Sequence, residues 1–225
     1  MTGIICAMES ELQAVLEHVN EEKTRQVGQV RIHYGMLDGK KVAACLSGVG
    51  KVNAAMATTI LCQDPEIERI VNVGVAGGLK EEQSVGDLVI SDEVAQADFD
   101  TSPIDGEAGI GLVFKVDEGL VEKACLAAHS LNIPYRIGGV ATQDLFMSRE
   151  EDYKKLLGRF PESACSEMEG GAVAQVATAF NKPFLVLRTL SDVAVHNDNP
   201  LEFSEFAKMA SRQAANVIRA FCALI

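Results

Sequence analysis

Four carboxylates and one arginine stand in or directly after apolar runs of the sequence that are typical of buried strands. These residues are Glu11, Glu167, Glu169, Arg188 and Asp192. Ligand crevices of α/β proteins lie beyond the carboxyl ends of strands, so the five side chains are predicted to converge on one cleft. A buried arginine also needs carboxylate partners, because an unpaired buried charge is costly. Taken alone, Glu11 is better explained as an acid in the first turn of a helix, where the helix dipole favours it.

Other catalytic arrangements lack their signatures. The sequence contains no G-x-S-x-G nucleophile elbow and no H-E-x-x-H zinc motif. Each histidine is interpreted as a surface or structural residue, from its place in a predicted helix, hairpin strand, helix end or polar loop: His18, His33, His129 and His196. Acid–base chemistry is therefore predicted to fall to the carboxylates.

Two glycine-rich segments match nucleotide-binding loops only in part. Residues 47–52 (SGVGKV) lack the first glycine of a P-loop, because position 45 is Cys, and Val52 stands where a magnesium-binding Ser or Thr is required. This segment is either a helix N-terminus that meets a polar ligand or a plain strand–helix connection. Residues 74–78 (GVAGG) lack the G-x-G-x-x-G pattern, but their small side chains let a ligand approach the backbone.

The elements that would position these residues alternate along the chain. Strands are predicted at 3–7, 30–37, 41–47, 69–75, 87–94, 135–141, 163–167 and 184–190. Helices are predicted at 10–18, 52–62, 118–131, 149–159, 170–180 and 203–224. Asp38-Gly39 predicts a two-residue hairpin turn, and residues 98–111 are expected to be irregular. This order favours an α/β fold with a mixed sheet.

The composition excludes several classes of protein. The chain has 225 residues, 48% of them hydrophobic and 23% charged, as in soluble globular proteins, and we expect one domain over residues 1–225. The formal net charge of −12 disfavours nucleic acid or an anionic membrane as a partner. We expect no signal peptide, because no basic leader precedes the first apolar run. No apolar stretch reaches the ~18 residues of a membrane span.

The six cysteines are predicted to be buried free thiols. They are widely spaced, form no C-x-x-C pair, and lie mostly in apolar runs. This pattern disfavours disulfides and a zinc site, and it favours a cytoplasmic location.

Once these residues are assembled, the chain resembles the 5′-methylthioadenosine/S-adenosylhomocysteine nucleosidases of the nucleoside phosphorylase superfamily. The resemblance runs almost end to end, through GIICAMESEL, SGVGKVNAA, NVGVAGGL, VGDLVISDE, DLFM, SEMEGGAVA and LRTLSDVA. It implies a three-layer α/β sandwich around a twisted mixed β-sheet. It also implies a homodimer whose partner subunit lends residues near the 5′ pocket, a small-molecule nucleoside substrate, and no metal or redox cofactor.

The resemblance assigns catalytic roles to three residues. Glu11 matches the glutamate that positions the attacking water, Arg188 the arginine that helps to hold this water, and Asp192 the acid that protonates N7 of the purine. The chemistry agrees, since a purine anion leaves poorly until it is protonated and a second carboxylate can orient water on the other face of the sugar. Asp192 would need a raised pKa for this role.

Substrate-binding roles follow from the same resemblance. Met168 and Glu169 match the ribose clamp, Phe146 the ring that stacks on the base, and Met147 the backbone that reads the edge of the base. The remaining binding residues implied are the pocket walls Val49 and Phe203, together with Ala76, Gly77 and Ser191.

The acidic first loop favours a hydrolase over a phosphorylase. A phosphorylase binds phosphate, normally with an arginine in that loop, whereas AMESEL carries no base. The chain departs from the family at Val75, where Ser or Thr is usual, and at residues 98–111, which lack the aromatic residues often found there. The sequence therefore leaves open a futalosine-type or other purine nucleosidase, a phosphorylase, and a non-catalytic nucleoside-binding module.

Overall fold

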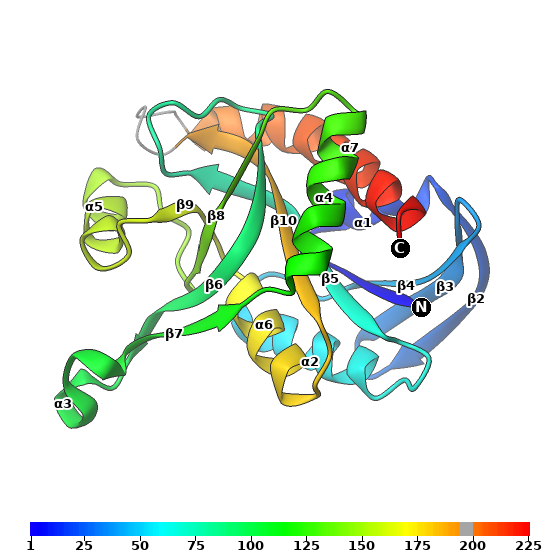
Figure 1. The fold of residues 1–225 in the computed structure, drawn as a ribbon, viewed down its shortest axis with the longest axis horizontal. Coiled ribbons are helices and arrows are strands. Elements are labelled where there is room, and N and C mark those ends of the chain that lie inside the picture. The colour runs from blue at the N-terminus through cyan, green and yellow to red at the C-terminus, as the bar shows by residue number, and fades with distance from the viewer. Residues whose placement is uncertain (194–199) are drawn as a thin grey trace.

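The computed structural model describes the backbone of residues 1–193 and 200–225, and the side chains of residues 1–193 and 206–225. In these residues a large mixed β-sheet lies between two layers of helices (Figure 1). The strands are β1 (Thr2–Cys6), β2 (Val19–Val27), β3 (Val30–Leu37), β4 (Lys40–Leu46), β5 (Arg69–Gly78), β6 (Leu88–Asp100), β7 (Ile110–Lys115), β8 (Tyr135–Thr142), β9 (Ser163–Glu167) and β10 (Phe184–Val193). The helices are α1 (Glu9–Leu16), α2 (Lys51–Cys62), α3 (Ser102–Asp105), α4 (Glu118–Ser130), α5 (Glu150–Arg159), α6 (Gly170–Ala179) and α7 (Pro200–Ala223), with a 3₁₀ turn, η1 (Gly106–Gly109).

The strand order brings the ends of distant strands together. The path is β10-β6-β8-β9-β5-β1-β4-β3-β2, and β10 also pairs in parallel with β5, so five strands close into a ring. In the β10–β5 register, Arg188 lies opposite Gly74 and Asp192 opposite Gly77. Gly77 also pairs with Ser166 of β9. The predicted site residues of three separate segments therefore meet at the ends of β5, β9 and β10.

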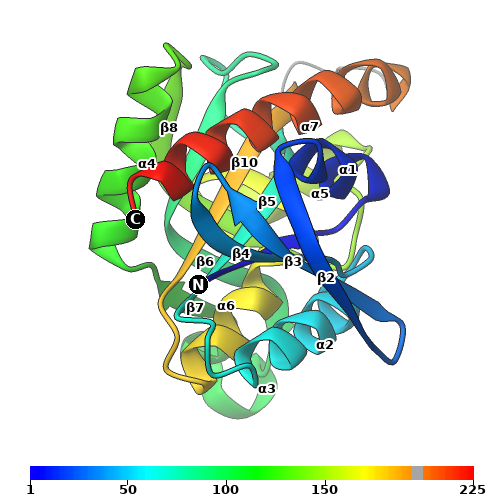
Figure 2. The ribbon, with the colours of Figure 1, turned by 90° about the vertical axis from the view of Figure 1, so that its right-hand side faces the viewer.

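The helices form the outer layers, as the three-layer prediction requires. Helices α1, α4 and α7 cover one face, and α7 packs on β5 and β10 (Figures 1 and 2). Helices α2 and α6 pack against each other on the opposite face. Helix α7 presents Val217, Ile218 and Phe221 to the core, where all three are fully buried. Apolar burial on both faces of the sheet explains why its central strands read as unbroken apolar runs.

Most predicted elements are confirmed within one to three residues at their ends. The Asp38-Gly39 turn is confirmed by its backbone, since both residues have positive φ values, 46° and 80°. These values are those that a tight hairpin turn requires. All six cysteines are free thiols, and five of them are buried, as predicted.

Two parts of the chain differ from the prediction. Strand β2 was not predicted, because its sequence (VNEEKTRQV) is polar and both of its faces are largely exposed at the edge of the sheet. Residues 98–111 are not simply irregular: β6 continues to Asp100, α3 and η1 follow, and β7 begins at Ile110. Pairing of β7 with β6 imposes strand structure there on a segment with weak local preference.

Within the part of the chain that the structure describes, no helix has the length and apolar character needed to cross a bilayer.

Candidate active site

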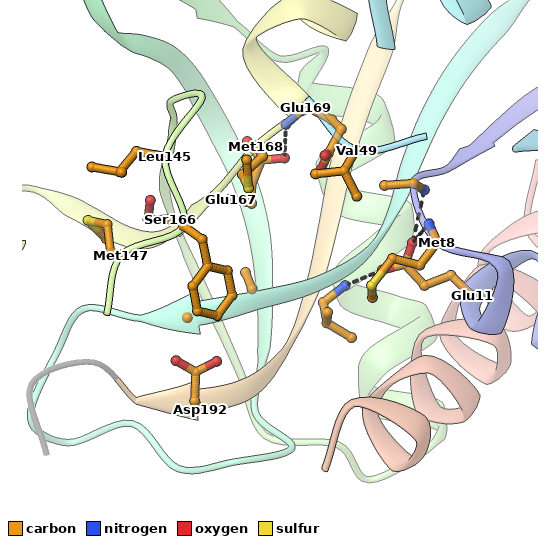
Figure 3. A pocket seen from close by; sticks show the side chains of 15 residues that line it. Met8, Glu11, Val49, Leu145, Met147, Ser166, Glu167, Met168, Glu169 and Asp192 are labelled. Carbon is orange, nitrogen blue, oxygen red and sulfur yellow. Dashed lines mark hydrogen bonds between the residues drawn. The ribbon is translucent and has the colours of Figure 1, made fainter. Parts of the chain in front are cut away.

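A cavity of about 240 Å³ opens where the carboxyl ends of several strands meet (Figure 3). Its lining comes from the segments that follow β1, β4 and β8 and from the ends of β5, β9 and β10. This is the place where α/β folds bind ligands. Among the described residues, the lining includes the carboxylates Glu11, Glu167, Glu169 and Asp192 and no Lys, Arg or His. The four acids that were expected to converge therefore line the same cavity.

Glu11 is held by backbone N–H groups from two parts of the chain. Its Oε2 accepts from Ala7 and Met8, each at 2.9 Å, and its Oε1 accepts from Val75 at 3.0 Å (Figure 3). Glycine is required at position 74, because a Cβ there would lie 2.5 Å from Glu11 Oε1. Glu11 lies in the first turn of α1, and its carboxylate therefore bonds back to the loop that precedes this helix.

Opposing effects act on the Glu11 carboxyl group. Burial raises its pKa, whereas the Arg188 guanidinium and the three backbone N–H groups act in the other direction. Burial wins, so the pKa of Glu11 is raised above its ordinary value. Val75, the residue that departs from the family pattern, still contributes to this arrangement through its backbone.

Arg188 lies behind the cavity and has 1% of its surface exposed. Its Nη2 donates to Glu167 Oε2, and to Asn72 Oδ1 at 2.5 Å. Glu169 Oε2 lies 3.6 Å from the same nitrogen. Burial works against the guanidinium charge, but the neighbouring carboxylates outweigh it and raise the pKa of Arg188. The predicted carboxylate partners of the buried arginine are confirmed.

Glu167 organises the start of α6. Its Oε2 accepts the backbone N–H groups of Glu169 at 3.0 Å and Gly170 at 2.7 Å, and its Oε1 accepts the Thr142 hydroxyl. The N–H groups of a helix N-terminus lack partners within the helix, so a carboxylate is favoured there. The sequence identifies Glu167 as one of the converging acids, and the structure shows that it also bonds to the Arg188 guanidinium.

Glu169 points into the cavity beside the turn that precedes α2 (Figure 3). Its Oε1 accepts the N–H of Gly50 at 2.9 Å. Burial, followed by repulsion from Glu167, raises the pKa of Glu169 to about 7. A carboxyl group with a pKa near neutral pH therefore follows Met168, which also lines the cavity.

Asp192 lies at a different side of the cavity from Glu11 (Figure 3). The register of β10 against β5 shifts between Leu190 and Asp192, and this irregularity re-aims the side chains at the strand end. Ser191 does not line the cavity: it is fully buried, and its hydroxyl donates to Asp192 Oδ1 at 2.8 Å. Ser191 thus contacts Asp192 directly, and its predicted contact with substrate stays a prediction.

An apolar wall faces the carboxylates. Phe146 and Val49 are each 49% exposed, and Met147, which follows Phe146 in the chain, also lines the cavity. The predicted residues Ala76 and Gly77 contribute the floor at the end of β5. Phe203 falls within α7, but its side chain lies outside the described residues. Carboxylates on two sides of an apolar cavity are suited to acid–base chemistry on a neutral ligand with a planar group.

Four lining residues were not predicted as site residues: Ala7, Met8, Leu145 and Ser166. Each is a direct neighbour of a predicted segment, so the strand-end rule applied to every residue of those segments would have found them. Among the described residues, no group of three or more His, Cys, Asp or Glu side chains is arranged to hold a metal ion.

Comparisons with a family model and with known sequences place the chain in one superfamily, and solved structures share its fold. The model of the phosphorylase superfamily matches residues 2–225. The 5′-methylthioadenosine/S-adenosylhomocysteine nucleosidase of Oceanobacillus iheyensis is 38% identical over 220 residues, which is 96% of each chain.

Solved structures agree with this result. The nucleosidase of the same name from Colwellia psychrerythraea, in complex with adenine, has 35% identity and a TM-score of 0.92, covering 99% of this chain and 94% of that one. Futalosine hydrolase of Helicobacter pylori has 26% identity and the same TM-score, covering 100% of this chain and 97% of that one. The chain therefore belongs to the 5′-methylthioadenosine/S-adenosylhomocysteine nucleosidase family of the phosphorylase superfamily.

Proposed function

We propose that the protein hydrolyses the N-glycosidic bond of 5′-thio-substituted adenosines, namely methylthioadenosine and S-adenosylhomocysteine, to adenine and the thioribose. The observation that carries this proposal is the placement of Glu11 and Asp192 on different sides of one cavity. Hydrolysis of a glycosidic bond needs an acid at the leaving group and a carboxylate at the attacking water.

The proposed mechanism divides the work between these two carboxyl groups. Asp192 gives a proton to N7 of the purine as the bond to the sugar lengthens, so the base leaves as a neutral molecule. Glu11 orients a water and accepts a proton from it as the water attacks C1′ of the oxocarbenium-like sugar. Glu169 accepts hydrogen bonds from the ribose hydroxyls, Met168 packs on the sugar, and Phe146 stacks on the base.

Arg188 is proposed to act on this chemistry through its carboxylate partners. Repulsion from Glu167, and to a lesser extent from Glu11, adds to burial in raising the pKa of Glu169. The guanidinium reduces this repulsion from behind the cavity. Its predicted contact with the attacking water stays a prediction.

Water is favoured over phosphate as the nucleophile by the contacts of Glu11. The N–H groups of Ala7 and Met8 form a possible anion site, but the Glu11 carboxylate already occupies it. Phosphate would also meet four carboxylates and no cation among the described lining residues.

The lining favours a neutral 5′ group. The thioethers of Met8 and Met168 supply polarizable, apolar surface on the sugar side of the cavity. A futalosine-type nucleoside carries a carboxylate on its 5′ substituent, and no described lining residue is a cation that would pair with it. Methylthioadenosine is therefore the preferred substrate of this proposal.

Base release from a panel of nucleosides tests the proposal. We expect the protein to release adenine from methylthioadenosine faster than from S-adenosylhomocysteine, and to act weakly on futalosine and inosine. Added phosphate should leave the rate unchanged, and the sugar product from methylthioadenosine should be the free methylthioribose rather than its 1-phosphate. A preference for futalosine, a phosphate-dependent rate, or no release from any nucleoside would each contradict the proposal.

Asp192→Asn tests the acid. Asparagine keeps the shape and the contact with Ser191 but has no acidic proton to give, so turnover should fall at least ~10²-fold. Steady-state kinetics with methylthioadenosine measures this, with Asp64→Asn as a matched control, because the Asp64 carboxylate bonds to the Tyr34 hydroxyl and does not line the cavity. Near-wild-type turnover of Asp192→Asn would remove Asp192 from the mechanism.

Glu169→Gln tests the shifted carboxyl group through stability. The folded-state pKa of about 7 lies above the ordinary 4.5, so the folded protein binds this proton more tightly than the unfolded chain. The contribution to stability is full below the ordinary pKa and is lost as the pH rises through the folded-state pKa. Denaturant unfolding of both proteins across this window should show wild type losing stability relative to Glu169→Gln as the pH rises. A pH-independent difference would contradict the assignment.

We also propose that the 225 residues form one domain, that the protein is a cytoplasmic homodimer, and that the partner contributes near the 5′ pocket. The free thiols support a reducing compartment, which cell fractionation would check. The large apolar side chains of Val52 and Ile104 are 80% and 86% exposed, and a second copy that covered either of them would remove apolar area from water. Sedimentation should give a dimer, and Val52→Glu should weaken it; a monomeric wild type would contradict the proposal.

A further inference from the structure

A cluster of three charged side chains connects segments that are far apart in the sequence. Lys51 begins α2, Asp98 lies in the outer part of β6, and Asp144 follows β8. Together they are called the 51–98–144 bridge. None of the three lines the cavity, and the proposed mechanism uses none of them.

Three hydrogen bonds make the bridge continuous. Lys51 N donates to Asp144 Oδ1 at 2.8 Å, and Asp144 N donates to Asp98 Oδ2 at 3.0 Å. Lys51 Nζ donates to Asp98 Oδ1 at 2.6 Å. Each residue therefore bonds to both of the others, so that the positions of all three segments are fixed relative to one another.

The start of α2 explains why Asp144 is needed. The residue before the helix is Gly50, which has no side chain to cap the helix and adopts a φ of 97°. Asp144 supplies the missing acceptor from another part of the chain, where the helix dipole favours a carboxylate. The fit is close, because a Cβ at position 50 would lie 3.2 Å from Asp144 Oδ1.

The bridge lies between two walls of the cavity. Directly after Asp144 come residues 145–147, all three of which line the cavity. Directly before Lys51 come Val49, which lines the cavity, and Gly50, whose N–H donates to Glu169. Residues 145–147 lie in no helix or strand, so their position depends on such anchors.

We propose that the 51–98–144 bridge sets the spacing between the wall that holds the base and the wall that holds the sugar, so that Asp144, Asp98 and Lys51 are positioning residues for nucleoside binding. The inference rests on the proposed function, since it takes residues 145–147 as the base wall and Glu169 as the ribose acceptor. It predicts a binding defect rather than a chemical one, because neither Glu11 nor Asp192 is displaced.

Asp144→Ala tests the proposal by kinetics. We expect KM for methylthioadenosine to rise about tenfold and kcat to change less than about threefold, the pattern of lost uniform binding. Asp144→Asn keeps an oxygen for Lys51 N–H and should recover most of the affinity. Glu93→Ala is the matched control: it removes another carboxylate of β6 that pairs with a lysine, Lys115, away from the cavity. A loss of kcat without a change in KM would overturn the proposal.

Two measurements that need no turnover separate this proposal from the proposed function. Calorimetry should show weaker adenine binding to Asp144→Ala by about the same factor as KM. Hydrogen exchange should be faster at the amides of Lys51 and residues 145–147 in Asp144→Ala than in wild type. If wild type releases no base but both changes appear, the bridge stands and the proposed function fails. If neither appears, the bridge is overturned.

Lys51→Met keeps the proposal falsifiable if Asp144→Ala does not fold. It retains the backbone N–H that bonds to Asp144 and removes only the contact of Nζ with Asp98. We expect a smaller rise in KM and faster exchange at residues 145–147. Unchanged KM and exchange would contradict the role of this residue in the bridge.

Discussion

The pairing of Arg188 with Glu167 is the interaction on which the rest of the cavity depends. A fully buried guanidinium is tolerated only with good hydrogen-bonding partners, and here Glu167 and Asn72 provide them. Glu167 in turn holds the Thr142 hydroxyl and the first N–H groups of α6. One buried ion pair therefore ties β8, β9, β10 and α6 into a fixed frame.

The same frame explains how several acids share so small a space. Burial disfavours the charged forms of Glu11 and Glu169, and the pKa values of both are raised. The guanidinium of Arg188 and three backbone N–H groups oppose this effect at Glu11. The outcome is a cavity that carries acidic groups but no cation among its described lining residues, an environment suited to a neutral nucleoside and water and poorly suited to phosphate.

The sequence could predict the site because strand ends are visible in it. Apolar runs indicate the strands, and the acids that follow them indicate the cavity, so the sequence alone predicts Glu11, Glu169 and Asp192 as site residues. Hydrogen-bond partners were not predictable: that Ser191 bonds to Asp192 and that Arg188 lies behind the cavity depend on register and on a bulge. Strand β2 was missed because an exposed edge strand carries no apolar alternation.

The central claim is that a water oriented by the Glu11 carboxylate cleaves the glycosidic bond. It is tested most directly by comparing the rate of adenine release with the affinity for adenine in Glu11→Gln. Glutamine has nearly the same shape but cannot accept a proton from water, so turnover should fall by at least ~10²-fold while adenine binding changes little. Turnover close to that of wild type, with binding intact, would contradict the account.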